Sequence, residues 1–535
     1  MKMLIKYIIL FTFVYSSEIS IGGKQYINYN SEWYNGNIEN IGSKIIPHRL
    51  IIKKTDESLL KNEDLISLGI NETDFIINDR SILNKYFILL INNAATDPFQ
   101  IAEKISKSNT FDYIEFDSYF DYTSFPNDPE YINQWNLDKI SMPSAWEITT
   151  GSENITVAVI DAGIEYTLDE FSDNIWNNIG EDLNGNGVTM LFENGVWIHD
   201  PADINGIDDD QNGYIDDFVG WDFREEDNSP SAVLTHGTYV SSIIGAKTNN
   251  NIFISGIAGG WGEIGGSKIM CLNNQTPGEL SCNAVNSALA IEYAISNGAN
   301  IINMSWTIEG QVEYYDYLTE VIQEGYNNNN IIFINSSGNN CGGANLNPHI
   351  TFPGILDEVI SVGSVYQDDI VWHDPYTEAG SCFGEELDIV APHSVYAVHP
   401  SGEGCATSFG GTSAAAPHVS GLAALLLSVD PSLENFMVRE IIINTADKVT
   451  AMNGVNFVLE YGYGRINVYN SLLNLLNRGD INQDGSINVI DIVLAVNMIL
   501  GGSYSEYETF MADINQDGII NILDIVALNN IILDT

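Results

Sequence analysis

The sequence predicts an α/β fold with a mostly parallel sheet and helices on both faces. A small α+β unit precedes this fold, and a tail of two loop-helix repeats follows it. Between residues 126 and 477, short apolar runs alternate with helical patterns, as they do in buried parallel sheets. The breaker-rich joint at 125–129 marks the boundary with the preceding unit. From residue 480 onward, an Asp- and Asn-rich loop pattern occurs twice.

The composition limits the possible partners. The 535 residues include 20 Lys and Arg against 72 Asp and Glu, a formal net charge of −52 at pH 7. This balance argues against nucleic acid as a partner, because binding phosphates requires clustered cations. The surplus of carboxylates suits binding of multivalent cations, solubility in salt, or both. Five cysteines allow at most two internal disulfides, and the sequence does not assign the pairs.

The first 16 residues predict a secretory signal peptide. Lys2 and Lys6 precede an apolar stretch at 7–15, and we expect cleavage after Ser16. The apolar stretch is too short to remain as a membrane anchor. We therefore expect an exported protein, secreted or at the cell surface, whose mature form has no membrane span.

Residues 17–125 contain no catalytic constellation. Strands are predicted at 86–91 and 113–116, with a short helix at 98–106 between them. This pattern predicts a small βαβ-type unit that ends at the breaker-rich joint.

The region 126–477 predicts the large α/β domain. Its apolar strands are expected at 155–160, 301–304, 331–334 and 359–362, and its intervening helices at 283–297 and 315–327. Folds of this kind place their chemistry at the carboxyl ends of the strands.

Four polar residues stand at such positions. Ser413 precedes an Ala-rich apolar run that stops at Pro431, so we expect it to cap a buried helix, where free N–H groups favour negative charge. Asp161 ends the first strand, His236 opens a helix, and Asn339 follows the strand at 331–335. Each residue alone also fits an ordinary cap, turn or structural role.

Together, Asp161, His236, Asn339 and Ser413 resemble the catalytic residues of the subtilisin-like serine peptidases, in their order along the chain. Supporting stretches of the same resemblance lie at 302–305, 387–392 and 461–467. The resemblance implies that Ser413 is the nucleophile, His236 the base and then the acid, and Asp161 the group that orients the imidazole. It also implies an oxyanion hole made by the Asn339 side-chain amide and the Ser413 N–H.

The same resemblance implies where an extended substrate binds. Backbone segments would pair with the substrate and wall its P1 pocket at Ser305, Trp306, Thr307, Ser337 and Gly338. The sequence departs from the family's usual residues at Ala162, Tyr239 and Ala414. These departures bear on specificity rather than on the type of reaction. Cys341 is expected either near the substrate or as a small buried apolar residue.

An acidic insertion at 175–230 separates Asp161 from His236. Its spacing predicts two calcium loops, one with ligands Asp182, Asn184, Asn186 and Glu193, the other with Asp208, Asp210, Asn212 and Asp216. The second loop has Val219 at its last position, so it requires another ligand, such as Asp217, or water. The alternative is a solvated acidic loop. We expect calcium to fold this insertion against the catalytic domain.

The tail at 480–535 resembles a type I dockerin module. Its two loops carry calcium-ligating residue types at the required spacing: Asp480, Asn482, Asp484, Asn488 and Asp491, and then Asp513, Asn515, Asp517, Asn521 and Asp524. Helices are expected at 492–500 and 525–533, packed antiparallel and dependent on the metal. The resemblance implies a cohesin-domain partner. The alternative is a calcium-stabilised terminal cap without a partner.

Given the resemblance of the following region to a peptidase, residues 17–125 resemble a propeptide. Such a segment assists folding and inhibits the enzyme until it is removed, here near 123–127. A permanently attached N-terminal domain is the alternative. The leading hypothesis is therefore an exported, calcium-stabilised serine endopeptidase made as a zymogen, with no organic cofactor. The competing hypothesis is a catalytically silent binding or scaffold protein that uses the same fold.

Overall fold

The computed structural model divides the chain into two compact units, one up to residue 122 and one from 123 onward. The predicted signal peptide, residues 123 and 124 of the predicted cleavage region, and the predicted ligands Asp484 and Asp517 lie outside the described residues. The structure describes residues 17–21, 24–29, 32–37, 40–55, 58–82, 85–91, 93, 96–118, 125–193, 196–277, 281–308, 315–342, 349–374, 376–377, 379–482, 486–502, 504, 506–515 and 519–534.

The first unit is an antiparallel sheet with two helices. The strands pair in the order β1-β2-β3-β4-β6-β5, and β7 pairs with the other edge of β4. The predicted strand, helix and strand are confirmed as β6, α2 and β7. The elements are β1 (Ser17–Ile21), β2 (Lys24–Tyr29), β3 (Glu32–Asn37), β4 (Asn40–Lys54), α1 (Asn62–Ile66), β5 (Phe75–Ile82), β6 (Tyr86–Ile91), α2 (Pro98–Ser106) and β7 (Phe111–Ser118).

From β4 onward, the unit follows a β-α-β-β-α-β order around one core. Helix α2 begins where Asp97 accepts a hydrogen bond from the Phe99 N–H at 2.9 Å, and Pro98 occupies the first helical position. Ile101 and Ile105, one helical turn apart, are buried against the sheet. The sequence pattern predicted only the second half of this arrangement, namely β6, α2 and β7.

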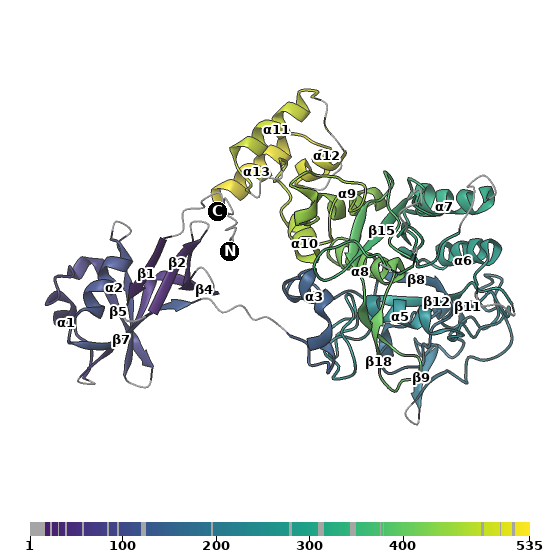
Figure 1. Ribbon diagram of the computed structural model, residues 1–535, viewed down its shortest axis with the longest axis horizontal. Coiled ribbons are helices and arrows are strands. Elements are labelled where there is room, and N and C mark those ends of the chain that lie inside the picture. Colours follow the sequence, from purple (N-terminus) through teal and green to yellow (C-terminus); the bar gives the residue numbers. More distant parts are fainter. Residues whose placement is uncertain are drawn as a thin grey trace, which may run out of the picture. The chain divides into compact units, whose positions relative to one another are not determined.

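The second unit contains a seven-stranded, wholly parallel sheet (Figure 1). All four strands predicted in this region are confirmed, as β8, β13, β14 and β15. In spatial order the strands are β11 (Gly220–Asp222), β12 (Lys268–Asn273), β8 (Thr156–Asp161), β13 (Ile301–Met304), β14 (Ile332–Ser336), β15 (Val359–Val365) and β16 (Ile389–Pro392).

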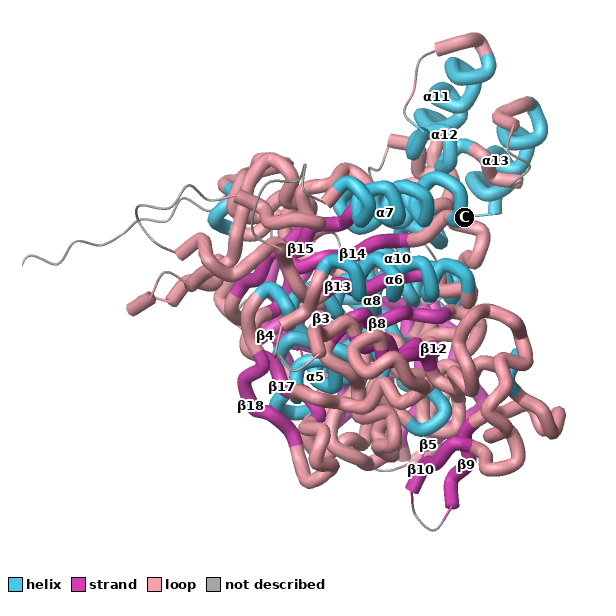
Figure 2. The backbone as a smooth tube through the Cα atoms, turned by 90° about the vertical axis from the view of Figure 1, so that its right-hand side faces the viewer, coloured by secondary structure: helices cyan, strands magenta, loops and turns pink. Residues whose placement is uncertain are grey.

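Helices cover both faces of this sheet, as predicted. In β8, Val157 and Val159 join a buried cluster with α5 (Thr235–Gly245) and α8 (Thr412–Val429), whereas Ala158 and Ile160 join a cluster on the opposite face. That second face is covered by α6 (Ala284–Ser296) and α7 (Asp316–Asn329), which Figure 2 shows across the strands. Since both faces are buried, the strands are apolar throughout.

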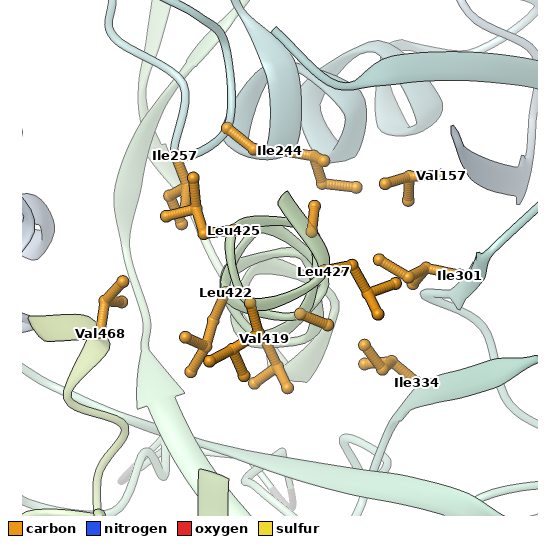
Figure 3. Close-up of a cluster of buried hydrophobic side chains, with 14 of the residues drawn as sticks. Val157, Ile244, Ile257, Ile301, Ile334, Val419, Leu422, Leu425, Leu427 and Val468 are labelled. Carbon is orange, nitrogen blue, oxygen red and sulfur yellow. The ribbon is translucent and has the colours of Figure 1, made fainter. Parts of the chain in front are cut away.

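Helix α8 is the central helix of the core (Figure 3). Every residue from Thr412 to Leu427 is buried, and Gly421 lets the helix approach Ile257, whose Cγ2 would lie 2.6 Å from a Cβ added there. Among the described residues, α8 is the one helix long and apolar enough to cross a membrane. Since 89% of it is buried inside the unit, it is a core helix.

The prediction that Ser413 caps α8 is wrong. The N-cap is Gly411, which has a φ of 81°, and Ser413 is the second residue inside the helix. A positive φ favours glycine and turns the chain sharply into the helix. The helix does end before Pro431, as predicted, with Asp430 as its C-cap.

The tail contains α11 (Val489–Ile499), α12 (Glu506–Ala512) and α13 (Ile522–Asp534), of which α11 and α13 pack together. The first and last helices begin three residues earlier than predicted, and α12 was not predicted. Asn488 and Asn521 cap α11 and α13, accepting hydrogen bonds at 2.8 Å from the Ile490 and Leu523 N–H groups.

The tail packs directly on the α/β domain of the second unit. Helix α10 (Val468–Leu476) leads into it, and Leu475 shares one buried cluster with Met511 and Leu528 of the tail. Arg478 pairs with Asp430 at 2.8 Å and lies over the ring of Phe510, 3.9 Å from its centroid. The tail is therefore continuous with the core of the second unit.

Candidate active site

Asp161 and His236 meet at the carboxyl end of β8, an interior strand of the parallel sheet. His236 is the second residue of α5, and its Nδ1 lies 2.8 Å from Asp161 Oδ1 and 3.0 Å from Oδ2. Asp161 is buried and also accepts the Ala162 N–H at 2.7 Å. Gly237 permits this contact, because a Cβ added there would lie 2.3 Å from the Gly163 carbonyl oxygen.

The contact with Asp161 determines the direction in which the pKa of the His236 imidazole is shifted. Burial disfavours the protonated ring, but the charge and hydrogen bond of Asp161 outweigh burial, so the pKa of His236 is raised above its ordinary value. With Nδ1 facing the carboxylate, the other ring nitrogen is the one left to exchange a proton.

Ser413 lies in the first turn of α8 and is held by Ser305. Ser413 Oγ donates to the Ser305 carbonyl at 3.0 Å, and Ser305 Oγ donates to the Ser413 carbonyl at 3.2 Å. The second bond replaces a helical one, because Pro417 has no N–H to donate to that carbonyl. Within the described part of the chain, no hydrogen bond joins Ser413 to His236. Catalytic hydrogen bonds are often long or poorly aligned without substrate and tighten when it binds.

Asn339 lies beside the start of α8. Its Oδ1 accepts hydrogen bonds from both the N–H and the hydroxyl of Thr412, each at 2.9 Å. The orientation assigned by these two donors leaves the Asn339 amide nitrogen to donate elsewhere. The N–H of Ser413, in the first helical turn, has no partner among the described residues. These two donors are the ones predicted for an oxyanion hole.

The predicted substrate segments have fixed positions. The Trp306 indole donates to the carbonyl of Ile160, at the end of β8, at 2.9 Å. The buried Ser337 hydroxyl donates to the carbonyl of Cys382 at 2.8 Å. Gly338 has a φ of 114°, and its N–H donates to Thr412 Oγ1 at 3.3 Å. Ser305 contacts Ser413 as described, and Thr307 is partly exposed.

Cys341 forms a disulfide with Cys382, so its interpretation as a small buried apolar residue is wrong. The bridge joins the loop after Asn339 to the segment that contacts Ser337 and Gly338. The other three thiols are free, and burial raises the pKa of Cys282 to about 11 and that of Cys405 to about 12.

The second predicted calcium loop lies beside buried carboxylates that sequence reasoning partly missed. Oxygens of Glu181, Asp210 and Asp217 lie within 4.8 Å of one another. Glu181 is fully buried, and its Oε2 has no hydrogen-bond partner among the described residues. Burial raises the pKa of Glu181 to about 7 and that of Asp217 to about 6. This donor set of hard oxygens, one of them unpartnered, fits a calcium ion.

Other predicted ligands of that loop bind their own backbone. Asp208 accepts from the N–H groups of Asn212 and Gly213, and Asp216 accepts from those of Asn205 and Gly206. The Asn212 amide donates to Asp217 at 3.0 Å. The loop is therefore closed by its own acidic side chains.

The first predicted loop gathers a different set of residues from the one expected. The amides of Asn184 and Asn186 both donate to Asp200 Oδ2 at 2.8 Å, and buried Asp203 has an unpartnered Oδ2 within the described structure. Asp182 accepts the N–H groups of its own loop at 185–187. The predicted ligand Glu193 instead ends strand β9 (Met190–Glu193), paired with β10 (Val196–His199), and is exposed.

A further buried acidic pair was missed. Asp128 accepts the backbone N–H groups of Asn249, Asn250 and Asn251. Glu170 accepts the Ile254 N–H at 3.0 Å, and burial raises its pKa to about 8. No sequence signal could have found this pair, because its parts are far apart in the chain.

In the tail, the last predicted ligand of each loop closes that loop. Asp491 accepts the Ile481 N–H at 2.8 Å, and Asp524 accepts the Ile514 N–H at 3.0 Å. Both carboxylates are fully buried. The two repeats thus have matching geometry around their predicted ligands.

Comparison with known families follows the same division of the chain. Residues 152–464 match the model described as Subtilase family. The chain belongs to the subtilase family. Residues 478–533 of this subtilase match the Dockerin type I domain, so the tail is a dockerin.

Several proteases resemble this subtilase. It is 28% identical over 403 residues to the thermophilic serine proteinase of Bacillus sp. (strain AK1), covering 74% of this chain and 80% of the relative. It is 28% identical over 349 residues to thermitase of Thermoactinomyces vulgaris, covering 65% and 99%. It is 31% identical over 377 residues to subtilisin-like protease 1 of Plasmodium berghei, covering 66% of this chain but 56% of that longer protein. The subtilase is accordingly a serine endopeptidase.

Proposed function

We propose that this subtilase hydrolyses peptide bonds of proteins through Asp161, His236 and Ser413. The observation that carries the proposal is the hydrogen bond of 2.8 Å between His236 Nδ1 and Asp161 Oδ1, together with the contact of the His236 ring with Phe409, which lies four residues before Ser413. In the reaction, His236 takes the proton of Ser413 Oγ as that oxygen attacks the substrate carbonyl. The Ser413 N–H and the Asn339 amide then bind the oxyanion.

The remaining steps use the same groups. His236 gives its proton to the leaving amine, which leaves an acyl-enzyme on Ser413. Water, deprotonated by His236, releases the acid product and restores the serine. Asp161 stabilises the imidazolium at each stage, consistent with the raised pKa of His236.

We also propose that the protein is made as a zymogen. The separate sheet unit at 17–118 is the segment that would act as folding aid and inhibitor, with removal near 123–127. The dockerin and the halolysin-like extracellular serine protease Nep of Natrialba magadii, a relative 24% identical, support a secreted or cell-surface location. The predicted signal peptide at 1–16 supplies the route.

Calcium is the proposed structural cofactor. The residues that would hold it in the insertion are Glu181, Asp210 and Asp217, whose converging oxygens and unpartnered Glu181 Oε2 fit a hard cation. Bound calcium would neutralise these buried carboxylates and stabilise the insertion. The loops headed by Asp480 and Asp513 are the proposed dockerin sites.

The dockerin is proposed to bind a cohesin domain. At the starts of α11 and α13, Val489 and Ile522 are 64% and 66% exposed, and the adjacent Ile490 and Leu523 are exposed as well. Such apolar patches are typical of interaction surfaces. A variant with Val489→Asp and Ile522→Asp should lose binding to an immobilised type I cohesin in calcium, whereas Leu459→Asp in the catalytic domain should not.

The decisive experiment for the peptidase compares wild type with Ser413→Ala, each with calcium and with chelator. Mass spectrometry follows loss of the N-terminal unit, and casein hydrolysis follows activity. We expect only calcium-loaded wild type to lose the unit and digest casein, with the variant reduced by a factor on the order of 10⁶. Equal inactivity of both proteins in calcium would favour the scaffold hypothesis instead.

A further inference from the structure

His393 lies behind the turn that carries the nucleophile. It follows β16, is 6% exposed, and its own N–H donates to the Val365 carbonyl at 2.8 Å. The ring stacks on Trp372 with 4.8 Å between centroids and meets Tyr366 edge-on at 4.9 Å. These contacts fix the ring from one side and leave its Nδ1 edge toward α8.

The Nδ1 edge binds the backbone immediately before the nucleophile. The N–H of Gly411 donates to His393 Nδ1 at 2.7 Å. Because a backbone N–H can only donate, Nδ1 must be the unprotonated nitrogen of a neutral ring. The ring also lies flat against Gly410, where an added Cβ would come within 2.7 Å of Cε1. Burial lowers the pKa of His393 to about 4, which keeps this acceptor available at neutral pH.

The segment that His393 holds is also the frame of the predicted oxyanion hole. Gly411 is the N-cap of α8, and a Cβ added there would lie 3.1 Å from Asn339 Oδ1. The next residue, Thr412, donates to that same Asn339 oxygen, and Ser413 follows. Movement of Gly411 would therefore shift both the Ser413 N–H and the Asn339 amide.

We infer that His393 is a positioning residue for the peptidase reaction, one that acts through Gly411 to hold the Ser413 and Asn339 donors at the oxyanion. His393 touches no reacting atom. Its neutral imidazole supplies the hydrogen-bond acceptor for the N–H of Gly411, whose φ of 81° is readily adopted by glycine alone. The inference rests on the proposed roles of Ser413 and Asn339, which the Ser413→Ala comparison tests separately.

Two substitutions at His393 distinguish the effect of its hydrogen-bond acceptor from the effect of its aromatic stacking. His393→Phe keeps an aromatic ring between Trp372 and Tyr366 but removes the acceptor for Gly411. His393→Asn keeps an acceptor near the Nδ1 position but removes most of the stacking. Since displacing catalytic groups by about 1 Å can cost about 100-fold in rate, we expect His393→Phe to lower kcat by about 10- to 100-fold with little change in KM. His393→Asn should recover most of that kcat despite a lower Tm.

Tyr366→Leu is the matched control, because it removes the edge-on ring and leaves the acceptor in place. It should lower Tm without lowering kcat. Hydrogen exchange followed by mass spectrometry on peptides spanning 409–414 gives a readout that does not depend on catalysis. Exchange at Gly411 should accelerate in His393→Phe and stay slow in His393→Asn and Tyr366→Leu.

A double-mutant cycle with Asn339→Ala completes the test. If His393 acts through the oxyanion hole, His393→Phe should cost much less kcat in the Asn339→Ala background than in wild type. Three results would overturn the inference: unchanged kcat and Gly411 exchange in His393→Phe, full additivity with Asn339→Ala, or an equal loss of kcat in Tyr366→Leu. Activity of the wild-type chain in the same assay separates these results from failure of the peptidase reaction itself.

Discussion

At the scale of single residues, the catalytic groups are held by neighbours that do no chemistry. Ser305 binds Ser413 through two hydrogen bonds, and one of these exists because Pro417 leaves the Ser413 carbonyl without a helical donor. Gly237 lets α5 bring His236 against Asp161. The proposed nucleophile is therefore held by Ser305 and the proposed base by Asp161, rather than by one another.

The raised pKa of His236 predicts the acid side of the pH profile. The reaction requires the neutral ring, so kcat/KM should rise with pH through a midpoint above the ordinary histidine pKa of about 6.5. Asp161→Asn removes the charge that raises this pKa, so the midpoint should move to lower pH while kcat falls by about 10⁴-fold. Rates on a peptide ester between pH 5 and 9 would check both effects, and an unmoved midpoint would contradict the assignment.

At the scale of elements, α8 carries the proposed nucleophile and is packed closely in the core. Gly421 lies where a Cβ would meet Ile257 at 2.6 Å, so Gly421→Ala should lower the free energy of unfolding by about 1–3 kcal/mol through overpacking. Ser428→Ala, near the partly exposed end of the same helix, should change it by less than about 0.5 kcal/mol. Urea denaturation with calcium present measures both values. Equal stability of the two variants would contradict the prediction and would show that Ile257 can move to accommodate the added methyl group.

We expect the stability of the insertion to depend on pH when calcium is removed. The pKa values of Glu181 and Asp217, about 7 and about 6, exceed those of unfolded carboxyls, so the folded state binds more protons between about pH 4.5 and 7. Stability from these groups is present at low pH and is lost as pH rises. In chelator, Tm should therefore rise as pH falls from 8 to 5.5. Calcium should remove most of this dependence, and Glu181→Gln should weaken both effects.

Local patterns in the sequence predicted some of these elements and missed others for physical reasons. Strands such as β8 and β13 are apolar throughout because both faces are buried, whereas β11, Gly220–Asp222, has no apolar run to detect. Spacing alone pointed to Glu193 as a ligand, but that residue lies in a hairpin. Glu181 and Asp217 come together only in the folded chain, so no local pattern could pair them.

At the scale of the whole molecule, the net charge of −52 destabilises the folded state through repulsion between its carboxylates. Salt shortens the range of repulsion between surface carboxylates to about 10 Å at 0.1 M and about 3 Å at 1 M. Tm measured in saturating calcium should therefore rise as sodium chloride increases over this range. Choline chloride should give a similar rise if screening is the cause, and a flat response to both salts would contradict it.

The direct packing of the dockerin has a consequence for where the enzyme can work. Arg478 lies between Asp430 and the ring of Phe510 and connects the dockerin to the C-terminal end of α8, the helix whose first turn contains Ser413. A peptidase joined to its attachment module by a long flexible linker would sample many orientations and could cut proteins attached nearby. If the dockerin binds a cohesin as proposed, the active site of this peptidase would instead keep a fixed orientation relative to the attachment point. We therefore expect it to cut mainly those substrates that reach the active site in that orientation.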